Sequence, residues 1–368
     1  MAHDTSWMLV EPGHAAIPAA AYTARFESVG LKLPERRLRT DELIASLRHH
    51  THIDLERLTG IRERRVCSEG EDSYTLAVDA ARDCLARSAH GAADLDMIIC
   101  SSISRYMGGL SYRFEPPLSL SIKEAIGAHA AVSFDLSNAC AGMLTGVFLL
   151  NDFIRRGVIR RGMVVSGEYI SGLGTNAAHD VRTIFSRQLA SLTLGDAGAA
   201  VIVDRAPAGR PGIALAGFTT ISEHSRLCYG LPAPHSPGAR MFTKARTIHK
   251  VAMEDAPPLL EDLLNDSGLR LADIDWLIPH QTSARALRAG ERKLRERFGA
   301  GPRHLVVNVE DFGNTSSTTH FVALHRYLTE GRFHAGDKVM LLALASGLEI
   351  GVIVLVMDEL VESHGRMH

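Results

Sequence analysis

The chain has 368 residues, 46% of them hydrophobic, and is long enough to bury a large core in two domains or in one duplicated α/β unit. Its 40 Lys and Arg residues nearly balance its 42 Asp and Glu residues. This balance excludes the excess positive charge with which proteins hold nucleic acids or anionic membranes non-specifically, so we expect small or locally presented partners and no nucleic acid.

The N-terminus and the cysteines indicate the compartment. Residues 1–21 lack the basic start and apolar core of a secretory signal, and we treat them as an N-terminal extension. The five cysteines, at positions 67, 84, 100, 140 and 228, are too scattered for a disulfide framework and form no CxxC pair of the kind that binds zinc. The sequence therefore predicts a protein of the reducing cytoplasm with no metal site.

Short β-rich runs alternate with helical patterns in the first part of the chain. The expected strands are 95–102, 131–137, 162–169 and 199–205. Apolar residues at three- and four-residue spacing predict helices over 72–88 and 141–157. This alternation predicts an α/β fold with a mostly parallel sheet covered by helices.

The same plan recurs after a candidate linker at 205–212, which is rich in Pro and Gly. The expected elements are helices over 251–268, from Ser283 and from Thr315, and strands over 275–280 and 304–309. The apolar run 339–357 carries Glu349 between two glycines, which favours two buried strands around a tight turn over a membrane span. We therefore expect two similar halves, 22–205 and 212–368.

One cysteine, Cys140, stands in FDLSNACAGMLTGV (134–147), where an apolar strand is expected to run into a helix. Unsatisfied N–H groups and the helix dipole at such a junction favour thiolate over thiol. Small neighbours leave room for a substrate. A single cysteine is also a common buried structural residue, so Cys140 on its own is either a nucleophile or a small core side chain.

Two polar residues of the second half occupy similar junctions. His280 ends the expected strand 275–280, and open α/β sheets bind ligands at the ends of their strands. Asn314 follows Gly313 and precedes an expected helix start, where the structural alternative is a helix N-cap. Cys140, His280 and Asn314 thus fall at the same edge of the expected sheets, which favours a shared chemical role.

The ordered motifs resemble the thiolase-fold condensing enzymes, specifically the ketoacyl synthase III group. The resemblance runs from about Tyr22 onward and rests on LTGIRERRV (58–66), NACAG around Cys140, LTLGDAGAA (192–200), DWLIPHQT (275–282), FGNTSS (312–317) and ASGLEIG (345–351). It implies a five-layer α-β-α-β-α thiolase fold, a homodimer, and a catalytic triad of Cys140, His280 and Asn314.

The resemblance also implies a role for each residue. Cys140 holds an acyl group as a thioester, while neutral His280 and Asn314 donate hydrogen bonds to the carbonyl of the second thioester and stabilise its enolate. The oxyanion hole is formed by the backbone N–H groups of Cys140 and Ser346. At Ser346 the family's run of glycines has become Ala-Ser-Gly, which keeps an N–H but alters the space beside it.

Other positions bear on the thioester carrier. An aromatic residue and an arginine that clasp coenzyme A in initiating enzymes correspond here to Asp54 and Leu58, so that clasp is missing. Ser283 replaces a family asparagine, and Arg285 matches an arginine implicated in docking of the carrier protein. The resemblance therefore favours acyl-carrier-protein donors over free coenzyme A thioesters.

The adjacent Arg64 and Arg65 are candidates to meet a phosphopantetheine arm. Their structural alternative is ordinary surface charge or ion pairing.

Glu115 stands where initiating enzymes carry an apolar residue that closes the partner subunit's acyl pocket. It resembles the glutamate that acts as a base in relatives that condense two acyl chains head to head. The resorcinol-forming synthases are related to those enzymes. The alternative is a surface carboxylate, with Phe114 or Tyr112 closing the pocket instead.

An insertion at 167–191 is expected to be a loop that reshapes the acyl tunnel or dimer seam, with Ile184 and Phe185 as pocket residues.

Three functions remain open at this point. The first is a carbon–carbon bond-forming acyltransferase of secondary lipid or polyketide metabolism that uses a malonyl, acyl or β-ketoacyl thioester as its second substrate. The second uses the same acyl-Cys140 intermediate for transfer to oxygen or nitrogen. The third is a non-catalytic partner subunit of a heterodimeric ketosynthase. None of them implies a metal, flavin or nicotinamide cofactor.

Overall fold

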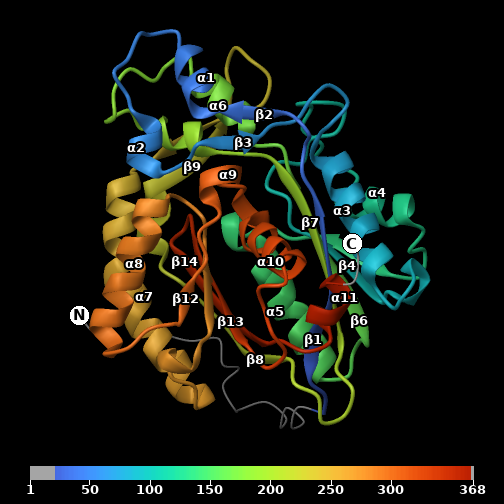
Figure 1. Cartoon of the computed structure of the whole chain (residues 1–368). Coiled ribbons are helices and arrows are strands. Elements are labelled where there is room, and N and C mark those ends of the chain that lie inside the picture. Colours follow the sequence, from blue (N-terminus) through green and yellow to red (C-terminus); the bar gives the residue numbers. More distant parts are fainter. Residues whose placement is uncertain (1–20, 366–368) are drawn as a thin grey trace.

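The computed structural model describes residues 21–365 (Figure 1). The predicted N-terminal extension therefore lies outside the described residues except for Ala21.

The first sheet has five strands in the order β1-β7-β6-β4-β5. Their bounds are Ala24–Lys32 (β1), Met97–Cys100 (β4), Val132–Asp135 (β5), Arg161–Glu168 (β6) and Ala197–Arg205 (β7). β6, β4 and β5 run parallel, whereas β7 is antiparallel to both of its neighbours. Four strands thus point the same way, but β7 runs against them, so the sheet is mixed, with two parallel and two antiparallel pairings, and the prediction of a mostly parallel sheet is met only by β6, β4 and β5.

The second sheet repeats this plan in the order β12-β11-β13-β14-β8. Its strands are Ile213–Thr220 (β8), Trp276–Pro279 (β11), His304–Leu305 (β12), Lys338–Ala345 (β13) and Glu349–Val356 (β14). β12, β11 and β13 are parallel, and β14 is antiparallel to both neighbours, like β7 in the first sheet. The two predicted similar halves are confirmed, and the run 339–357 forms the two strands expected of it.

Helices divide the molecule into five layers (Figure 1). The long helices are Ser73–Arg87 (α3), Leu118–Ile126 (α4), Gly142–Arg155 (α5), Ala245–Ser267 (α7), Ala284–Phe298 (α8) and Thr319–Thr329 (α10). α5 and α10 lie between the sheets, and a central core cluster joins residues of both sheets to them. α3 and α4 cover the outer face of the first sheet, and α7 and α8 that of the second. This is the predicted α-β-α-β-α fold.

Shorter elements complete the chain. They are β2 (Arg37–Arg39), α1 (Thr40–Ala45), α2 (Leu55–Thr59), β3 (Glu63–Arg65), α6 (Ser171–Ala177), β9 (Cys228–Pro232), β10 (Ala239–Thr243), α9 (Val309–Phe312) and α11 (Leu360–Gly365), with 3-10 turns at Ala92–Asp94, Ala139–Ala141, Leu189–Thr193, Ser222–Leu227, Leu271–Asp273 and Ser316–Thr318. β9 and β10 form a separate antiparallel hairpin that the sequence patterns did not indicate.

Three predicted elements differ from the structure. The strand 304–309 is limited to β12, because the chain turns into α9 at Val309. The helix from Thr315 begins at Thr319, because Ser316 has a φ of 56° that is incompatible with a right-handed helix. The segment 167–191 is not a loop throughout, since it contains the end of β6 and the whole of α6.

Within residues 21–365, no helix combines the length and the apolar character that crossing a membrane requires.

Candidate active site

One large cavity, of about 1200 Å³, brings the predicted site residues together. Cys140, His280, Asn314 and Ser346 all line it. They come from the turn before α5, the end of β11, the connection after α9 and the turn between β13 and β14. The cavity therefore lies where strand ends of both halves meet, as expected for an α/β sheet.

Cys140 lies in the 3-10 turn that leads into α5, and the preceding Ala139 has a positive φ of 44°. Its Sγ atom is 3.6 Å from the Oγ atom of Ser316. Burial raises the pKa of the Cys140 thiol to about 12, and the hydrogen bond with Ser316 acts in the opposite direction. In the free protein, burial of the sulfur therefore opposes the thiolate that a helix N-terminus favours.

His280 is held neutral. Only 5% of the residue is exposed, and burial, followed by the nearby His320, lowers its pKa to about 3. The two imidazole rings are 5.9 Å apart between centroids. The His280 backbone N–H donates to Leu342 O at 2.9 Å, while its Nδ1 atom is buried without a hydrogen-bond partner in the described part of the chain. A neutral imidazole at this position can donate a hydrogen bond without bringing a charge into the cavity.

Asn314 is fixed by its backbone and by its side-chain oxygen. Its N–H donates to Thr193 O at 2.9 Å, and its C=O accepts from the Gly195 N–H at 3.0 Å. Its Oδ1 atom accepts from the Ser316 N–H at 2.9 Å. Asn314 therefore closes a local turn, while Thr318 occupies the N-cap of α10, so the N-cap alternative is wrong. Among residues 21–365 its Nδ2 group has no acceptor assigned, which leaves amide hydrogens for a ligand carbonyl.

Ser346 lies in the hairpin turn beside a half-buried acid, Glu349, that the sequence motifs did not identify as part of the site. Ala345 and Glu349 are paired across the β13–β14 ladder on either side of this turn. The Glu349 Oε2 atom is buried and has no partner in the described residues. Burial raises the pKa of Glu349, and a hydrogen bond with Asn138 lowers it. Glu349 thus links the turn of Ser346 to the loop that precedes Cys140.

A further acid, Glu168, is buried at the end of β6 and was also missed by the sequence patterns. It is fully buried, and burial raises its pKa against the donors around it. Those donors are the N–H of Ile103, the N–H and hydroxyl of Ser104, and the hydroxyls of Ser166 and Ser317. A carboxyl group that ends an apolar strand was the only sequence signal for it.

The two arginines do not reach the cavity. Arg64 is fully buried, where its guanidinium donates to Thr40 Oγ1 at 3.1 Å and to Leu192 O at 3.0 Å. Arg65 donates to the backbone oxygens of Pro34 and Glu35. The prediction that they meet a phosphopantetheine arm is wrong, because their donors are directed to the protein's own carbonyl and hydroxyl groups. The alternative of ordinary surface charge is also wrong for Arg64, because that residue is fully buried.

The remaining binding candidates lie at or outside the cavity. Ser283 lines it and caps α8 by accepting from the Ala286 N–H at 3.1 Å. Arg285 is exposed on α8 and does not line the cavity. Asp54 caps α2 by accepting from the Arg57 N–H, so it offers no aromatic or cationic surface to a nucleotide.

Large apolar side chains form the mouth of the cavity. Phe114 is 81% exposed and Phe185 is 73% exposed, although both line the cavity. Tyr112, Ile184 and Leu58 line it as well. The predicted pocket roles of Ile184 and Phe185 therefore agree with the structure. Glu115 is exposed and does not line the cavity of its own chain.

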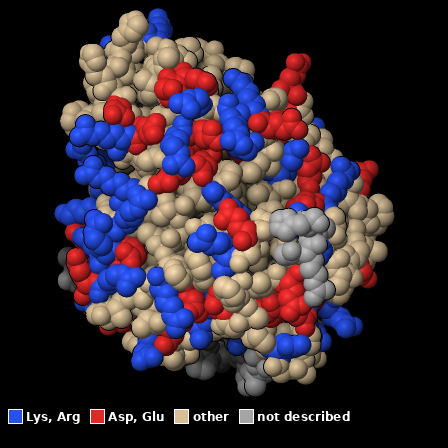
Figure 2. Space-filling model, in the orientation of Figure 1, with Lys and Arg blue, Asp and Glu red and all other residues tan. Residues whose placement is uncertain are grey.

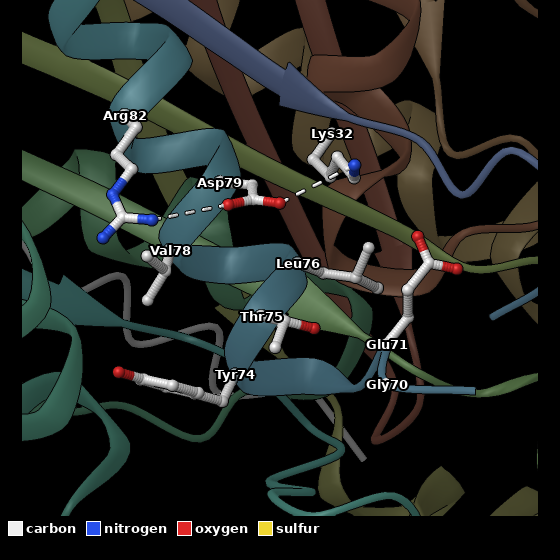
Figure 3. Close-up of a pocket in the computed structure, with 9 residues that line it drawn as sticks. All are labelled: Lys32, Gly70, Glu71, Tyr74, Thr75, Leu76, Val78, Asp79 and Arg82. Carbon is white, nitrogen blue, oxygen red and sulfur yellow. Dashed lines mark ion pairs between the residues drawn. The ribbon is translucent and has the colours of Figure 1, made fainter. Parts of the chain in front are cut away.

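A smaller hollow of about 310 Å³ lies along α3 (Figure 3). Lys32 and Arg82 approach the two carboxylate oxygens of Asp79 there, at 3.6 and 3.7 Å. These side chains are partly exposed and already paired, and no candidate nucleophile lines the hollow. Throughout the described chain, moreover, no group of three or more His, Cys, Asp or Glu residues is arranged to hold a metal ion. The large cavity is thus the candidate site.

Comparison with known proteins matches this chain to one family. Two family models match, that of the 3-oxoacyl-[acyl-carrier-protein] synthase III over residues 134–223 and that of its C-terminal part over residues 264–357. β-Ketoacyl-[acyl-carrier-protein] synthase III of Symbiobacterium thermophilum is 30% identical over 352 residues, which span 89% of this chain and 96% of that protein. The enzyme of the same name from Deinococcus deserti is 30% identical over 87% of each chain.

Solved structures show the same fold. A variant of OleA from Xanthomonas campestris superposes with a TM-score of 0.81 at 22% identity, over 91% of this chain and 98% of that one. The 3-oxoacyl-[acyl-carrier-protein] synthase III of Aquifex aeolicus superposes with a TM-score of 0.77 at 24% identity, over 91% of this chain and all of that one.

Proposed function

Because this chain belongs to the 3-oxoacyl-[acyl-carrier-protein] synthase III family, we propose that it is an acyltransferase that joins two acyl thioesters by Claisen-type condensation. The observation that carries this proposal is the convergence of Cys140, neutral His280 and Asn314 on one large cavity. A nucleophile and two hydrogen-bond donors at a shared cavity suit the two halves of such a reaction.

The first half-reaction is acyl transfer to Cys140. The Cys140 sulfur forms a bond to the acyl carbon, the carbon–sulfur bond of the donor thioester breaks, and the thiol proton ends on the leaving sulfur. The backbone N–H groups of Cys140 and Ser346 would bind the oxyanion of the tetrahedral intermediate. Serine at position 346 does not prevent this, since only a backbone N–H is required.

The second half-reaction requires a carbanion equivalent. His280 and the free amide of Asn314 would donate hydrogen bonds to the carbonyl of the second thioester and stabilise its enolate, formed by loss of CO2 or of a proton. The enolate carbon then attacks the acyl carbon on Cys140 and releases the Cys140 sulfur. A cationic imidazole is unnecessary, because a neutral donor suffices for this hydrogen bond.

The thioesters would be presented by an acyl carrier protein. Lys and Arg side chains gather along the side of the molecule where α8 lies (Figure 2). Arg285, on this helix, is exposed and forms no ion pair with any residue from 21 to 365. The neighbouring Arg288 is paired with Glu310. An unpaired cation beside the cavity mouth suits an acidic carrier, whereas Asp54 and Leu58 offer no clasp for coenzyme A. The chemistry requires no metal, flavin or nicotinamide.

Glu115 would act in a homodimer. It is exposed beside the apolar Phe114 in a segment whose neighbours line the cavity mouth, and a second chain could receive it in its own cavity. A carboxylate there would serve as the base that removes a proton from a second acyl thioester, so that no malonyl unit is required. If Glu115→Ala keeps the full rate with every accepted pair of substrates, this role is excluded.

Two other outcomes would use the same cavity differently. Acyl-Cys140 could pass its acyl group to an oxygen or nitrogen nucleophile, which requires the same first half-reaction. A non-catalytic partner subunit requires neither half-reaction, and the presence of Cys140 with both of its partners argues against it.

Intact-protein mass spectrometry of wild type and Cys140→Ala after exposure to a panel of acyl thioesters tests the proposal. We expect an adduct on wild type alone, and peptide mapping separates Cys140 from Cys228, the other cysteine that lines the cavity. Discharge by malonyl thioester to a longer β-keto product indicates decarboxylative condensation. Discharge by a second acyl thioester alone indicates the route through Glu115. Absence of any adduct contradicts the proposal and favours the non-catalytic subunit.

A further inference from the structure

Ser316 combines three unusual features beside the nucleophile. It has a positive φ of 56°, a conformation that is uncommon for residues other than glycine. Only 4% of the residue is exposed, and it lines the cavity. Its Oγ atom is 3.6 Å from Cys140 Sγ, within hydrogen-bonding range for the large sulfur atom. A serine in a strained conformation at a cavity is more informative than one in a helix or strand, because such strain persists only where the surroundings impose it.

The surroundings hold Ser316 from both sides. On one side its N–H donates to Asn314 Oδ1 at 2.9 Å. On the other side the hydroxyl of the adjacent Ser317 donates to Glu168 at 2.5 Å and lies 2.8 Å from the hydroxyl of Ser166. Glu168 is fully buried and surrounded by donors, so it is a fixed anchor. The strained turn is therefore clamped between the first half of the chain and Asn314, and the Ser316 hydroxyl is presented to the sulfur.

We propose that Ser316 is a further catalytic residue, whose hydroxyl donates a hydrogen bond to the Cys140 sulfur as the thiol loses its proton. This inference rests on the proposed role of Cys140 as the nucleophile. Thiolate, not thiol, is the reactive form of cysteine, and a hydrogen bond to the charged form favours it. The acyl transfer itself is unchanged: the sulfur bonds to the acyl carbon, the donor carbon–sulfur bond breaks, and the thiol proton ends on the leaving sulfur.

The other titratable groups near the sulfur do not stabilise a thiolate. Cys228, from β9, and Glu168, from β6, both oppose the formation of a thiolate at Cys140. His280 is neutral and offers no positive charge. The hydroxyl of Ser316 is the largest influence that favours the thiolate.

The test is the rate at which iodoacetamide alkylates Cys140, followed by peptide mapping from about pH 7 to about pH 10 in wild type, Ser316→Ala and Ser316→Gly. This range lies below the pKa of the Cys140 thiol. Loss of the hydroxyl should raise that pKa by about one unit, which would appear as an alkylation rate about three- to tenfold lower at every pH in the range. The lower factor applies because a more basic thiolate is more nucleophilic. The same variants should slow acylation by acyl thioesters to a similar degree.

Glycine at position 316 accepts the positive φ without strain, so Ser316→Gly separates loss of the hydroxyl from loss of the turn. Ser267→Ala, a change at the far end of α7, is the matched control and should behave as wild type. An unchanged profile in both Ser316→Ala and Ser316→Gly overturns the proposal. Because alkylation requires no acyl thioester, this result is independent of whether the protein performs condensation.

Discussion

His320 should make the stability of this protein depend on pH in a way that one substitution can remove. The residue is fully buried in α10, and its Nε2 atom lies 3.0 Å from Leu342 O, which assigns the ring proton to Nε2. Its Nδ1 atom is buried without a partner in the described part of the chain. A second ring proton would therefore have no acceptor, and burial lowers the pKa of His320 to about 4.

The sign follows from the unfolded chain, in which this histidine has its ordinary pKa of 6.5. Between these two values the unfolded state binds the extra proton and the folded state does not, so stability falls as the pH drops below about 6.5 and levels off near pH 4. At about 1.4 kcal/mol per pKa unit, His320 should lower the free energy of unfolding by about 2 kcal/mol between pH 8 and pH 5.

Urea unfolding of wild type and His320→Gln at both pH values, at one fixed protein concentration, measures this contribution of His320 to the pH dependence of stability. Glutamine can keep a hydrogen bond to Leu342 O but does not take up a proton in this range. The loss in free energy of unfolding caused by His320→Gln should therefore be about 2 kcal/mol smaller at pH 5 than at pH 8. His129→Gln changes an exposed histidine and serves as the matched control. If His320→Gln lowers the free energy of unfolding equally at both pH values, the reasoning from burial is refuted.

Three further substitutions test the fold and the docking surface. Phe321→Ala should lower the free energy of unfolding by about 3–5 kcal/mol in urea titrations, because Phe321 is fully buried between the sheets and stacks on Phe26; a cost below about 1 kcal/mol would contradict this packing. Gly167→Ala should reduce the yield of folded protein, since a methyl group there would overlap the carbonyl of Ser73. A variant with the same thermal unfolding midpoint as wild type would show that Gly167 and Ser73 lie farther apart than this overlap requires. Arg285→Glu should weaken condensation with carrier-protein donors by several-fold in KM but leave short pantetheine thioesters unaffected, with exposed Arg332→Glu as control; equal loss with both donors would indicate a structural effect instead.

The sequence determined the fold and the identity of the candidate site to a large extent. Alternating strand and helix patterns located β4 to β7 and the long helices, because period-two and period-3.6 burial is a local property of these elements. Cys140, His280 and Asn314 were recognised at strand–helix junctions, and a duplicated sheet brings such junctions to a common edge. The predictions failed in short segments whose conformation depends on one residue. The positive φ of Ser316, for example, moves the start of α10 to Thr319.

Only the tertiary structure decided the electrostatics of the site. The pKa of a thiol depends on how deeply the whole fold encloses it, so burial opposes the thiolate that the position of Cys140 before α5 favours. For the same reason Arg64, which reads as a surface cation, is enclosed by residues distant in sequence such as Leu192. The contact between Cys140 and Ser316 spans 176 positions and joins the two halves, so no local pattern could have predicted it.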